Sequence, residues 1–357
     1  MNLRDIANYR LMSQQIEGTK FKAAKDLVSW MGAMQAQDYS MAKWGIGMRL
    51  LTATENNIDE AIDSGEIIRT HVLRPTWHFV SAGDIYWMLE LTGPAIKALA
   101  KSREKQLDLT EKIFSKSNAV IEKALRNGKH LTRDELKTVL RKNKIAVDNS
   151  RASHLFLRAE LEGIICSGIH KEKKFTHALL GDRVLKTKKI HKEEALAMLA
   201  QRYFTSHAPA TLQDFTWWSG LSAKNARHAF EIIKNNFISE TINAQTFWFP
   251  GTLAALKAHM KSVYLLPAFD EFLVSYKDRS AAIVFEHQEK AFSNNGIFWP
   301  TILINGRVSG IWKRTIKKNT ITIETDFFQP ANKTTKALVE KAGRGLSHFL
   351  NKKILPL

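Results

Sequence analysis

The chain has 357 residues, and its content of 44% hydrophobic and 10% aromatic residues is sufficient for the packed cores of two or three domains. The 53 Lys and Arg residues outnumber the 35 Asp and Glu residues, and the net charge of +18 favours a polyanionic partner, with nucleic acid as the leading candidate. A basic surface that serves only solubility would have the same composition. The single cysteine, Cys166, excludes an intramolecular disulfide framework and any cysteine-rich metal centre.

Targeting and cofactor signals are missing from the sequence. The first residues, MNLRDIANYR, do not resemble a signal peptide, and no segment approaches the roughly 18 apolar residues that a membrane-spanning helix requires. There is no H-E-x-x-H motif, no Walker loop and no strand-anchored G-x-G-x-x-G motif. The nearest histidine pair, His71 and His78, suits a structural or DNA-facing role better than a metal site. We therefore expect a soluble cytoplasmic protein that uses no cofactor and no metal and does not bind a membrane.

Apolar spacing predicts helices near residues 3–17, 20–34 and 54–64 in the first part of the chain. Gly65 stands where a helix would end, and residues 67–70 and 76–80 are rich in β-forming side chains. Helices that are followed by a short β-hairpin are typical of a winged helix.

The same order of elements recurs twice. A second copy, at 117–180, has a capping box that starts at Thr132 and a lysine-rich turn, Lys171 to Lys174, that suits a basic wing. A third copy, at 192–250, has a helix that starts at Thr211 and a hairpin that ends at Phe249. The copies lie roughly 80 residues apart, which favours tandem domains over a stacked solenoid.

The last part of the chain changes to β character. We expect strands at 263–266, 281–285, 299–305, 308–314 and 320–324, and a closing helix at 333–351. Asn305-Gly306 is a strong signal for a two-residue hairpin turn. The predicted fold class is α+β, with three tandem winged-helix domains and a C-terminal antiparallel β-rich region. The expected divisions are 1–110, 111–190, 191–260 and 261–357.

Six segments together resemble one known family, the AlkZ-like (YcaQ-like) DNA glycosylases. The most specific of these segments contains Gln35-Ala36-Gln37-Asp38, which is similar to the Q-x-Q-D signature of that family. The matching segments are MGAMQAQDY at 31–39, RTHVLRPTWHFV at 69–80, LQDFTWWSGL at 212–221, LLPAFDEF at 265–272, YKDRS at 276–280 and GIFWPTIL at 296–303. They extend over nearly the whole chain.

The resemblance implies three winged helices in a C-shaped array around duplex DNA, with Gln35 and Gln37 as the catalytic pair. It also implies that a hairpin within 261–357 probes the lesion. Residues i and i+2 point to one side only in an extended chain, so we expect the two glutamines at a helix end or turn. Without the family match, capping or loop bracing would be the better explanation of such a pair. Asp38 is a candidate for catalytic support, although an Asp at this place suits a turn equally well.

The residue types agree with glycosidic hydrolysis of a charged base. A purine alkylated at N7 or N3 is cationic and leaves as a neutral base, so little help from a general acid is needed. Two oriented amide oxygens can hold a water molecule and stabilise an oxocarbenium-like sugar. An uncharged normal base is a much worse leaving group, and selectivity then follows from the charge of the substrate.

Further residues are candidates for DNA binding. Arg74, Thr76 and His78 alternate along a presumed strand and would face one side together. The family commonly has glycine where this chain has Pro75, which leaves the lesion specificity open. Basic residues in or beside the later hairpins are Lys277, Arg279, Arg307, Lys313 and Arg314. The pair Trp217 and Trp218 could stack on bases, but packing inside the third repeat is the favoured interpretation.

The leading hypothesis is a monofunctional DNA glycosylase that excises cationic or bulky alkylpurines, including crosslink adducts, from duplex DNA as a monomer. An open channel would hold a bulky adduct without full rotation of the base into a pocket. The alternative is a non-catalytic winged-helix DNA-binding protein such as a transcriptional regulator, and a third class is an architectural or RNA-associated scaffold. A regulator would protect specific sequences, whereas a glycosylase would bind with little sequence preference.

Overall fold

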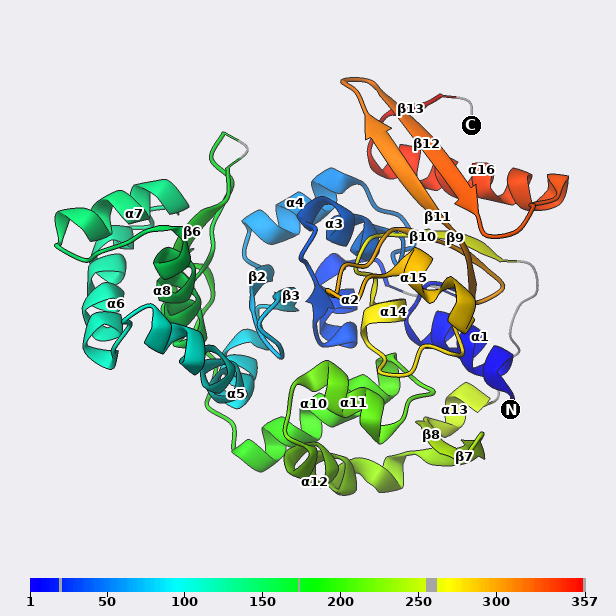
Figure 1. Ribbon diagram of the computed structural model, residues 1–357, viewed down its shortest axis with the longest axis horizontal. Coiled ribbons are helices and arrows are strands. Elements are labelled where there is room, and N and C mark those ends of the chain that lie inside the picture. The colour runs from blue at the N-terminus through cyan, green and yellow to red at the C-terminus, as the bar shows by residue number, and fades with distance from the viewer. Residues whose placement is uncertain (19–20, 173, 255–261, 356–357) are drawn as a thin grey trace.

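The computed structural model is a mixed α and β protein, which confirms the predicted α+β class (Figure 1). The described residues are 1–18, 21–172, 174–254 and 262–355. Lys173 of the expected basic wing and the expected boundary at residue 260 lie outside these residues. In the described part of the chain, no helix is long and apolar enough to cross a membrane.

The first part of the chain is built around a three-stranded sheet of order β1-β3-β2. Capping boxes at Asn2 and Thr54 start α1 and α4. The elements are α1 (Leu3–Ser13), α2 (Ala24–Met31), β1 (Met34–Gln35), α3 (Tyr39–Gly47), α4 (Glu55–Asp63), β2 (Ile67–His71), β3 (Trp77–Ser81) and α5 (Ile85–Gln106). Helices α2, α3 and α4 occupy the middle of the molecule in Figure 1.

The second part forms a lobe with its own buried core, drawn in teal and green at the left of Figure 1. Its three-stranded sheet has the order β4-β6-β5, and the predicted capping box at Thr132 is present at the start of α7. The elements are α6 (Glu111–Leu125), β4 (Leu131–Thr132), α7 (Arg133–Lys142), α8 (Asn149–Leu161), β5 (Ile165–Ser167), β6 (Thr176–Leu179) and α9 (Leu180–Arg183).

The third part is a helical group followed by a two-stranded hairpin. Thr211 caps α11 with the expected capping box, and Gly220 ends this helix in the left-handed conformation. The elements are α10 (Lys192–Ser206), α11 (Leu212–Ser219), α12 (Ala223–Ile233), the 3₁₀ turn η1 (Lys234–Asn236), β7 (Ile238–Ile242), β8 (Gln245–Phe249) and α13 (Gly251–Ala254).

The last part contains a five-stranded sheet of order β13-β12-β11-β10-β9, covered by α16. All neighbouring strands are antiparallel except β12 and β13, which are parallel. Asn305 and Gly306 both have positive φ, as a two-residue hairpin turn requires, which confirms that prediction. The elements are β9 (Val263–Leu266), α14 (Glu271–Val274), η2 (Phe285–His287), α15 (Gln288–Ala291), β10 (Thr301–Ile304), β11 (Arg307–Ile316), β12 (Thr320–Phe327), α16 (Lys333–Phe349) and β13 (Lys353–Ile354).

One predicted strand was wrong, and two helices of the structure were not predicted. Residues 281–285 form a turn instead of a strand, because the amides of Ala282 and Ile283 both donate to the Arg279 carbonyl. Helices α3 and α5 were not predicted, since α3 contains Gly45 and Gly47 and α5 contains Pro94, which all disfavour helix interiors. Packing requires glycine at position 47, because a Cβ atom there would lie 2.3 Å from the Phe349 ring of α16.

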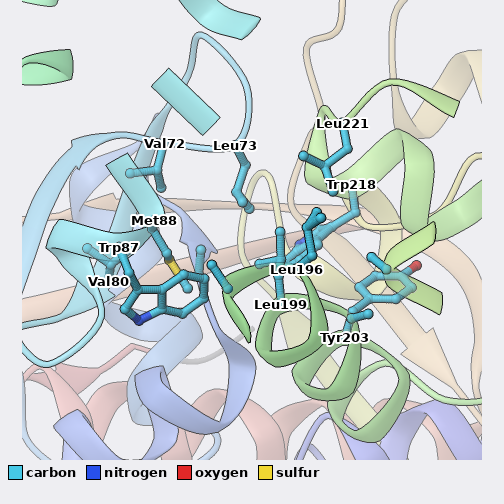
Figure 2. Close-up of a cluster of buried hydrophobic side chains, with 14 of the residues drawn as sticks. Val72, Leu73, Val80, Trp87, Met88, Leu196, Leu199, Tyr203, Trp218 and Leu221 are labelled. Atoms are coloured by element: carbon cyan, nitrogen blue, oxygen red, sulfur yellow. The ribbon is translucent and has the colours of Figure 1, made fainter. Parts of the chain in front are cut away.

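Buried side chains join parts of the chain that are distant in sequence. One cluster combines residues after β2 and from α5 with residues from α10 and α11, and Figure 2 shows Leu73 and Trp87 gathered with Leu196, Tyr203 and Trp218. A second cluster combines α2 and α3 with the C-terminal sheet. The first part of the chain is therefore packed between the third and the last parts.

A buried ion pair connects these layers. Arg49, which is fully buried after α3, donates two hydrogen bonds to the two carboxylate oxygens of Asp270, at 2.7 and 2.8 Å. The same guanidinium donates to the carbonyl groups of Gln14 and Gly45. Asp270 also caps α14 by accepting from the Phe272 amide. One guanidinium thus holds α1, α3 and α14 together.

We expect Asp270→Asn to lower the free energy of unfolding by about 3–5 kcal/mol, because it leaves a buried Arg49 charge without a counter-charge. Denaturant unfolding followed by circular dichroism measures the change. The control is Glu66→Gln, which breaks the exposed pair of Lys25 and Glu66 and should leave the free energy of unfolding nearly unchanged. An equal effect of the two substitutions would contradict this role of Asp270.

Candidate functional site

Gln35 lies in extended chain at the edge of the first sheet. Helix α2 ends at Gly32, whose φ of 78° turns the backbone so that Gln35 pairs with His78 of β3. The Ala36 amide then donates to the Trp77 carbonyl at 2.7 Å. The expectation of a helix end or turn is corrected for Gln35, which lies in this short strand, whereas Gln37 lies in a bend directly before a helix, as expected. Gln35 is half-buried and Gln37 is exposed at the bend before α3.

Gln35 is held at both its backbone and its side chain. The Gln35 amide donates to the Glu271 carboxylate at 2.5 Å, and the Gln35 side-chain oxygen accepts from the Arg74 guanidinium at 3.3 Å. The Glu271 side chain is buried, and its other oxygen accepts from the Ser275 hydroxyl. The Glu271 contact fixes the Gln35 backbone, and the Arg74 contact orients its side-chain amide.

Glu271 is an ionised carboxylate in this site. Burial alone would raise its pKa, but the nearby His207 side chain, the Ser275 hydroxyl and the Gln35 amide together lower the pKa to about 2. Sequence analysis placed Glu271 in a matching segment without giving it a role. The signal that was available is an acidic pair, Asp270 and Glu271, shortly after the apolar strand segment 263–266.

Asp38 has a structural role at the start of α3. Its carboxylate accepts a hydrogen bond from the Met41 amide at 3.0 Å and caps the helix. Sequence analysis did not foresee this, because α3 itself was not predicted. The exposed Asp38 side chain still adjoins Gln37 in the chain.

The expectation that Arg74, Thr76 and His78 alternate along one strand is wrong. Only His78 belongs to β3, while Arg74 and Thr76 lie in the turn between β2 and β3. The Thr76 amide donates to the Arg74 carbonyl, which closes this turn before the strand begins. His78 is fully buried in the central strand of the sheet, and burial lowers its pKa to about 3. As folded, His78 faces Gln35 and not the solvent.

Three of the expected DNA-binding cations are brought together around one indole ring. Lys277, Arg279 and Arg74 have their charged groups 4.8, 5.7 and 5.8 Å from the centre of the Trp217 ring. Trp217 is 38% exposed and donates from its indole nitrogen to the Val274 carbonyl. Burial, and next the neighbouring Arg74, lower the pKa of Arg279 to about 10, so it remains charged at neutral pH.

The two tryptophans of α11 therefore differ. Trp218 is fully buried in the core, which confirms the packing interpretation for this residue. Trp217 is exposed among cations, so packing was the wrong interpretation for it. Successive helical residues are separated by about 100° around the axis, and this spacing was a signal that the two rings face different surroundings.

The remaining basic candidates lie on β11 and are not gathered at one place. Arg314 donates to the Ser40 hydroxyl beside Asp38, and burial lowers its pKa. Lys313 is exposed next to it. Arg307 begins the same strand, and seven residues of extended chain place it roughly 24 Å from Arg314. The structure thus brings Arg314, but not Arg307, close to the glutamine segment.

A comparison with protein families matches residues 28–349 to the model described as DNA glycosylase AlkZ-like. The chain belongs to the AlkZ-like family of DNA glycosylases. It is therefore an enzyme of DNA repair that acts on DNA. A curated relative from Streptomyces sahachiroi, named interstrand DNA cross-link repair glycosylase, is 22% identical over 332 residues, which are 87% of each chain.

The structure of the Streptomyces sahachiroi DNA glycosylase AlkZ has the same fold. It superimposes on 99% of this chain and on 100% of its own, with a TM-score of 0.82 and 20% sequence identity. At this level of identity the likeness concerns the fold alone. The assignment of individual residues in the AlkZ-like chain depends on the local geometry around Gln35.

We expect Glu271→Gln to destabilise this AlkZ-like protein by about 1.5–3 kcal/mol at pH 7, because a hydrogen bond to a charged acceptor is lost. The folded pKa of about 2 lies below the ordinary value of 4.5, so the stabilisation by Glu271 is present above pH 4.5 and is lost as the pH falls toward 2. Thermal unfolding of wild type and variant between pH 7 and pH 2 measures this stabilisation. The difference between wild type and variant should shrink in that window.

The control for this prediction is Glu289→Gln, which changes an exposed side chain on α15. It should leave both the stability at pH 7 and its pH dependence nearly unchanged. A stability difference for Glu271→Gln that stays constant from pH 7 to pH 2 would contradict the ionised state of Glu271.

Proposed function

We propose that this AlkZ-like enzyme is a monofunctional DNA glycosylase that hydrolyses the N-glycosidic bond of cationic or bulky alkylpurines in duplex DNA. Crosslink adducts are included, because the Streptomyces relative is named as an interstrand cross-link repair glycosylase. The observation that carries the proposal is the double anchoring of Gln35 by Glu271 and Arg74, beside the exposed Gln37.

In the proposed reaction, the side-chain oxygen of Gln35 faces the sugar and the side-chain oxygen of Gln37 holds the attacking water. A carbonyl oxygen has two lone pairs, so the Gln35 oxygen can accept from Arg74 and still face a developing positive charge. Gln37 would complete the position of the attacking water, with Asp38 as a supporting neighbour. Glu271 remains ionised at pH 7 and therefore has no proton to give to the leaving base. A cationic alkylpurine needs no such proton, whereas a normal base does.

Duplex DNA would lie in the channel that the winged-helix domains form. We assign the four divisions 1–110, 111–190, 191–260 and 261–357 to three tandem winged-helix domains and a C-terminal β-rich region, and the β11–β12 hairpin to contact with the lesion. The order of helices and sheet in residues 111–183 supports this assignment. The protein would act as a monomer. Phosphate contacts would come first from the cations around Trp217 and from Lys313 and Arg314.

The catalytic proposal predicts that Gln35→Ala and Gln37→Ala each reduce base excision by about 100-fold, since oriented dipoles in a reactive site have this order of effect. The assay incubates duplex DNA containing 7-methylguanine, a bulky N7 adduct or an interstrand crosslink, and then reveals abasic sites by alkaline cleavage. Undamaged duplex should stay intact.

Gln106→Ala, which changes an exposed glutamine at the end of α5, is the matched control and should retain wild-type activity. Full activity of the double variant Gln35→Ala with Gln37→Ala would overturn the assignment of these residues. Failure of the wild-type protein on every one of these lesions would overturn the proposed substrate class.

The DNA-binding proposal predicts that Lys277→Ala lowers the slope of log affinity against log salt by about 0.9, which is the value for one lost phosphate contact. Fluorescence anisotropy with an undamaged duplex between low and moderate salt measures the slope. Lys336→Ala, on the exposed side of α16, removes the same charge away from Trp217 and should leave the slope unchanged. Equal slopes for both variants would contradict the role of Lys277.

A further inference from the structure

A buried cation beside the glutamine segment has no part in the proposed reaction so far. Arg69 of β2 is the first residue of the segment 69–80 that resembles the family, and it is only 7% exposed. A buried guanidinium needs hydrogen-bond acceptors inside the protein, because it has lost those of water. The acceptor of Arg69 lies between Gln35 and Gln37.

The Arg69 guanidinium holds the carbonyl group of Ala36. Two of its nitrogen atoms, Nε and a terminal one, donate to this single oxygen at 3.1 and 3.0 Å. Hydrogen bonds from a charged donor are roughly twice as strong as those between neutral groups. The Ala36 amide is held as well, since it donates to the Trp77 carbonyl at 2.7 Å. The peptide groups on both sides of Ala36 are therefore fixed.

This contact sets the direction of Gln37. The Ala36 carbonyl belongs to the planar peptide group that ends at the Gln37 nitrogen, so a fixed carbonyl also fixes where the Gln37 backbone begins. On the other side of Gln37, the Asp38 carboxylate accepts from the Met41 amide and caps α3. Gln37 lies in a bend between these two held points.

The second lobe holds Arg69 in turn. The Arg69 amide donates to the Ser167 hydroxyl of β5 at 3.2 Å. The guanidinium carbon lies 4.2 Å from the centre of the Trp77 ring and 4.9 Å from that of Phe175, which stands just before β6. A cation is attracted to an aromatic ring at such distances. A side chain of the second lobe thus contacts the group that holds Ala36.

Arg69 is charged at neutral pH but is not placed to contact DNA. Burial lowers the pKa of Arg69 to about 10, against the opposing effect of the nearby Glu160. Cations that bind phosphate must reach the surface, and Arg69 does not. Its charge is therefore directed at the protein itself.

We propose that Arg69 is a positioning residue of the reaction, which holds the Ala36 carbonyl so that Gln37 keeps its direction toward the attacking water. The Phe175 ring of the second lobe keeps the Arg69 guanidinium in place. The inference deepens the proposed function and rests on it. It gives the second lobe a part in the reaction as well as in DNA binding.

The test separates the rate of base excision from DNA affinity. Single-turnover excision of 7-methylguanine with saturating enzyme gives the rate constant, and fluorescence anisotropy with undamaged duplex gives the Kd. Arg69→Met should lower the rate constant by about 100-fold, since a shift of about 1 Å in a reacting group has this order of effect, and should leave the Kd nearly unchanged. Arg69→Lys keeps the charge without the planar fork and should recover part of the rate.

Arg133→Met is the matched control. Arg133 of α7 makes the same kinds of contact away from Ala36, because it donates to the Asn149 carbonyl and lies over the Phe156 ring. This variant should excise at the wild-type rate. An equal loss of rate in Arg133→Met and Arg69→Met would overturn the inference, and so would a Kd that rises in parallel with the loss of rate in Arg69→Met.

A double variant tests the role of the second lobe. Phe175 is 47% exposed, so Phe175→Ala should fold, and we expect it to lower the rate constant several-fold. Because Phe175 acts through Arg69, adding Phe175→Ala to Arg69→Met should cause no further loss. Two effects that multiply would overturn this link. Phe285→Ala, at a side chain that is 85% exposed, is the control for Phe175→Ala and should excise as wild type.

Hydrogen exchange gives a measurement that does not depend on activity. In Arg69→Met, the amides of a peptide that contains Ala36 and Gln37 should exchange faster than in wild type, as detected by mass spectrometry, whereas Arg133→Met should leave them unchanged. Unchanged exchange in Arg69→Met would overturn the inference.

The outcomes also distinguish this inference from the proposed function. A wild-type rate in Arg69→Met together with an inactive Gln37→Ala would overturn the inference alone. Absence of excision by the wild-type protein on every lesion, together with faster exchange in Arg69→Met, would remove the proposed reaction and leave the hold of Arg69 on Ala36 in place.

Discussion

Two adjacent buried carboxylates, Asp270 and Glu271, hold the last part of the chain against the first. Asp270 binds Arg49 through two hydrogen bonds, and Glu271 accepts from the Gln35 amide. Both residues stand at the start of α14, a helix of four residues. Buried ionic groups are tolerated only when their hydrogen-bonding capacity is met, so this helix can occupy only one position. The position of Gln35 depends on it.

The same arrangement limits the chemistry that the site can perform. Gln35 contacts one anion, Glu271, and one cation, Arg74, and neither is a proton donor suited to a normal leaving base. Oriented neutral amides act on charge that develops during the reaction without any need to reorganise. In the proposed reaction, a substrate that already carries positive charge on its base is the one that such a site would process. In that proposal, selectivity for damage follows from electrostatics.

Local sequence signals predicted the elements whose structure depends on nearby residues. The capping box at Thr132 and the hairpin turn at Asn305 and Gly306 are satisfied within a few residues of chain, and both were predicted. Helix α3 was missed, because Gly47 disfavours a helix locally and is required only by the approach of Phe349 from α16. The burial of His78 was missed for a similar reason, since β1 makes β3 the central strand of its sheet.

The sequence by itself determined the α+β class, a basic partner surface and, through Gln35 and Gln37, the resemblance to the family that the comparisons show. These properties depend on composition, periodicity and short motifs. Only the tertiary structure decided that Glu271 anchors Gln35 and that Trp217 faces solvent among three cations. Along the chain, Gln35 is separated by 39 positions from Arg74 and by 236 positions from Glu271, the two residues that contact it. No local signal encodes such contacts, because they arise from how separate layers pack.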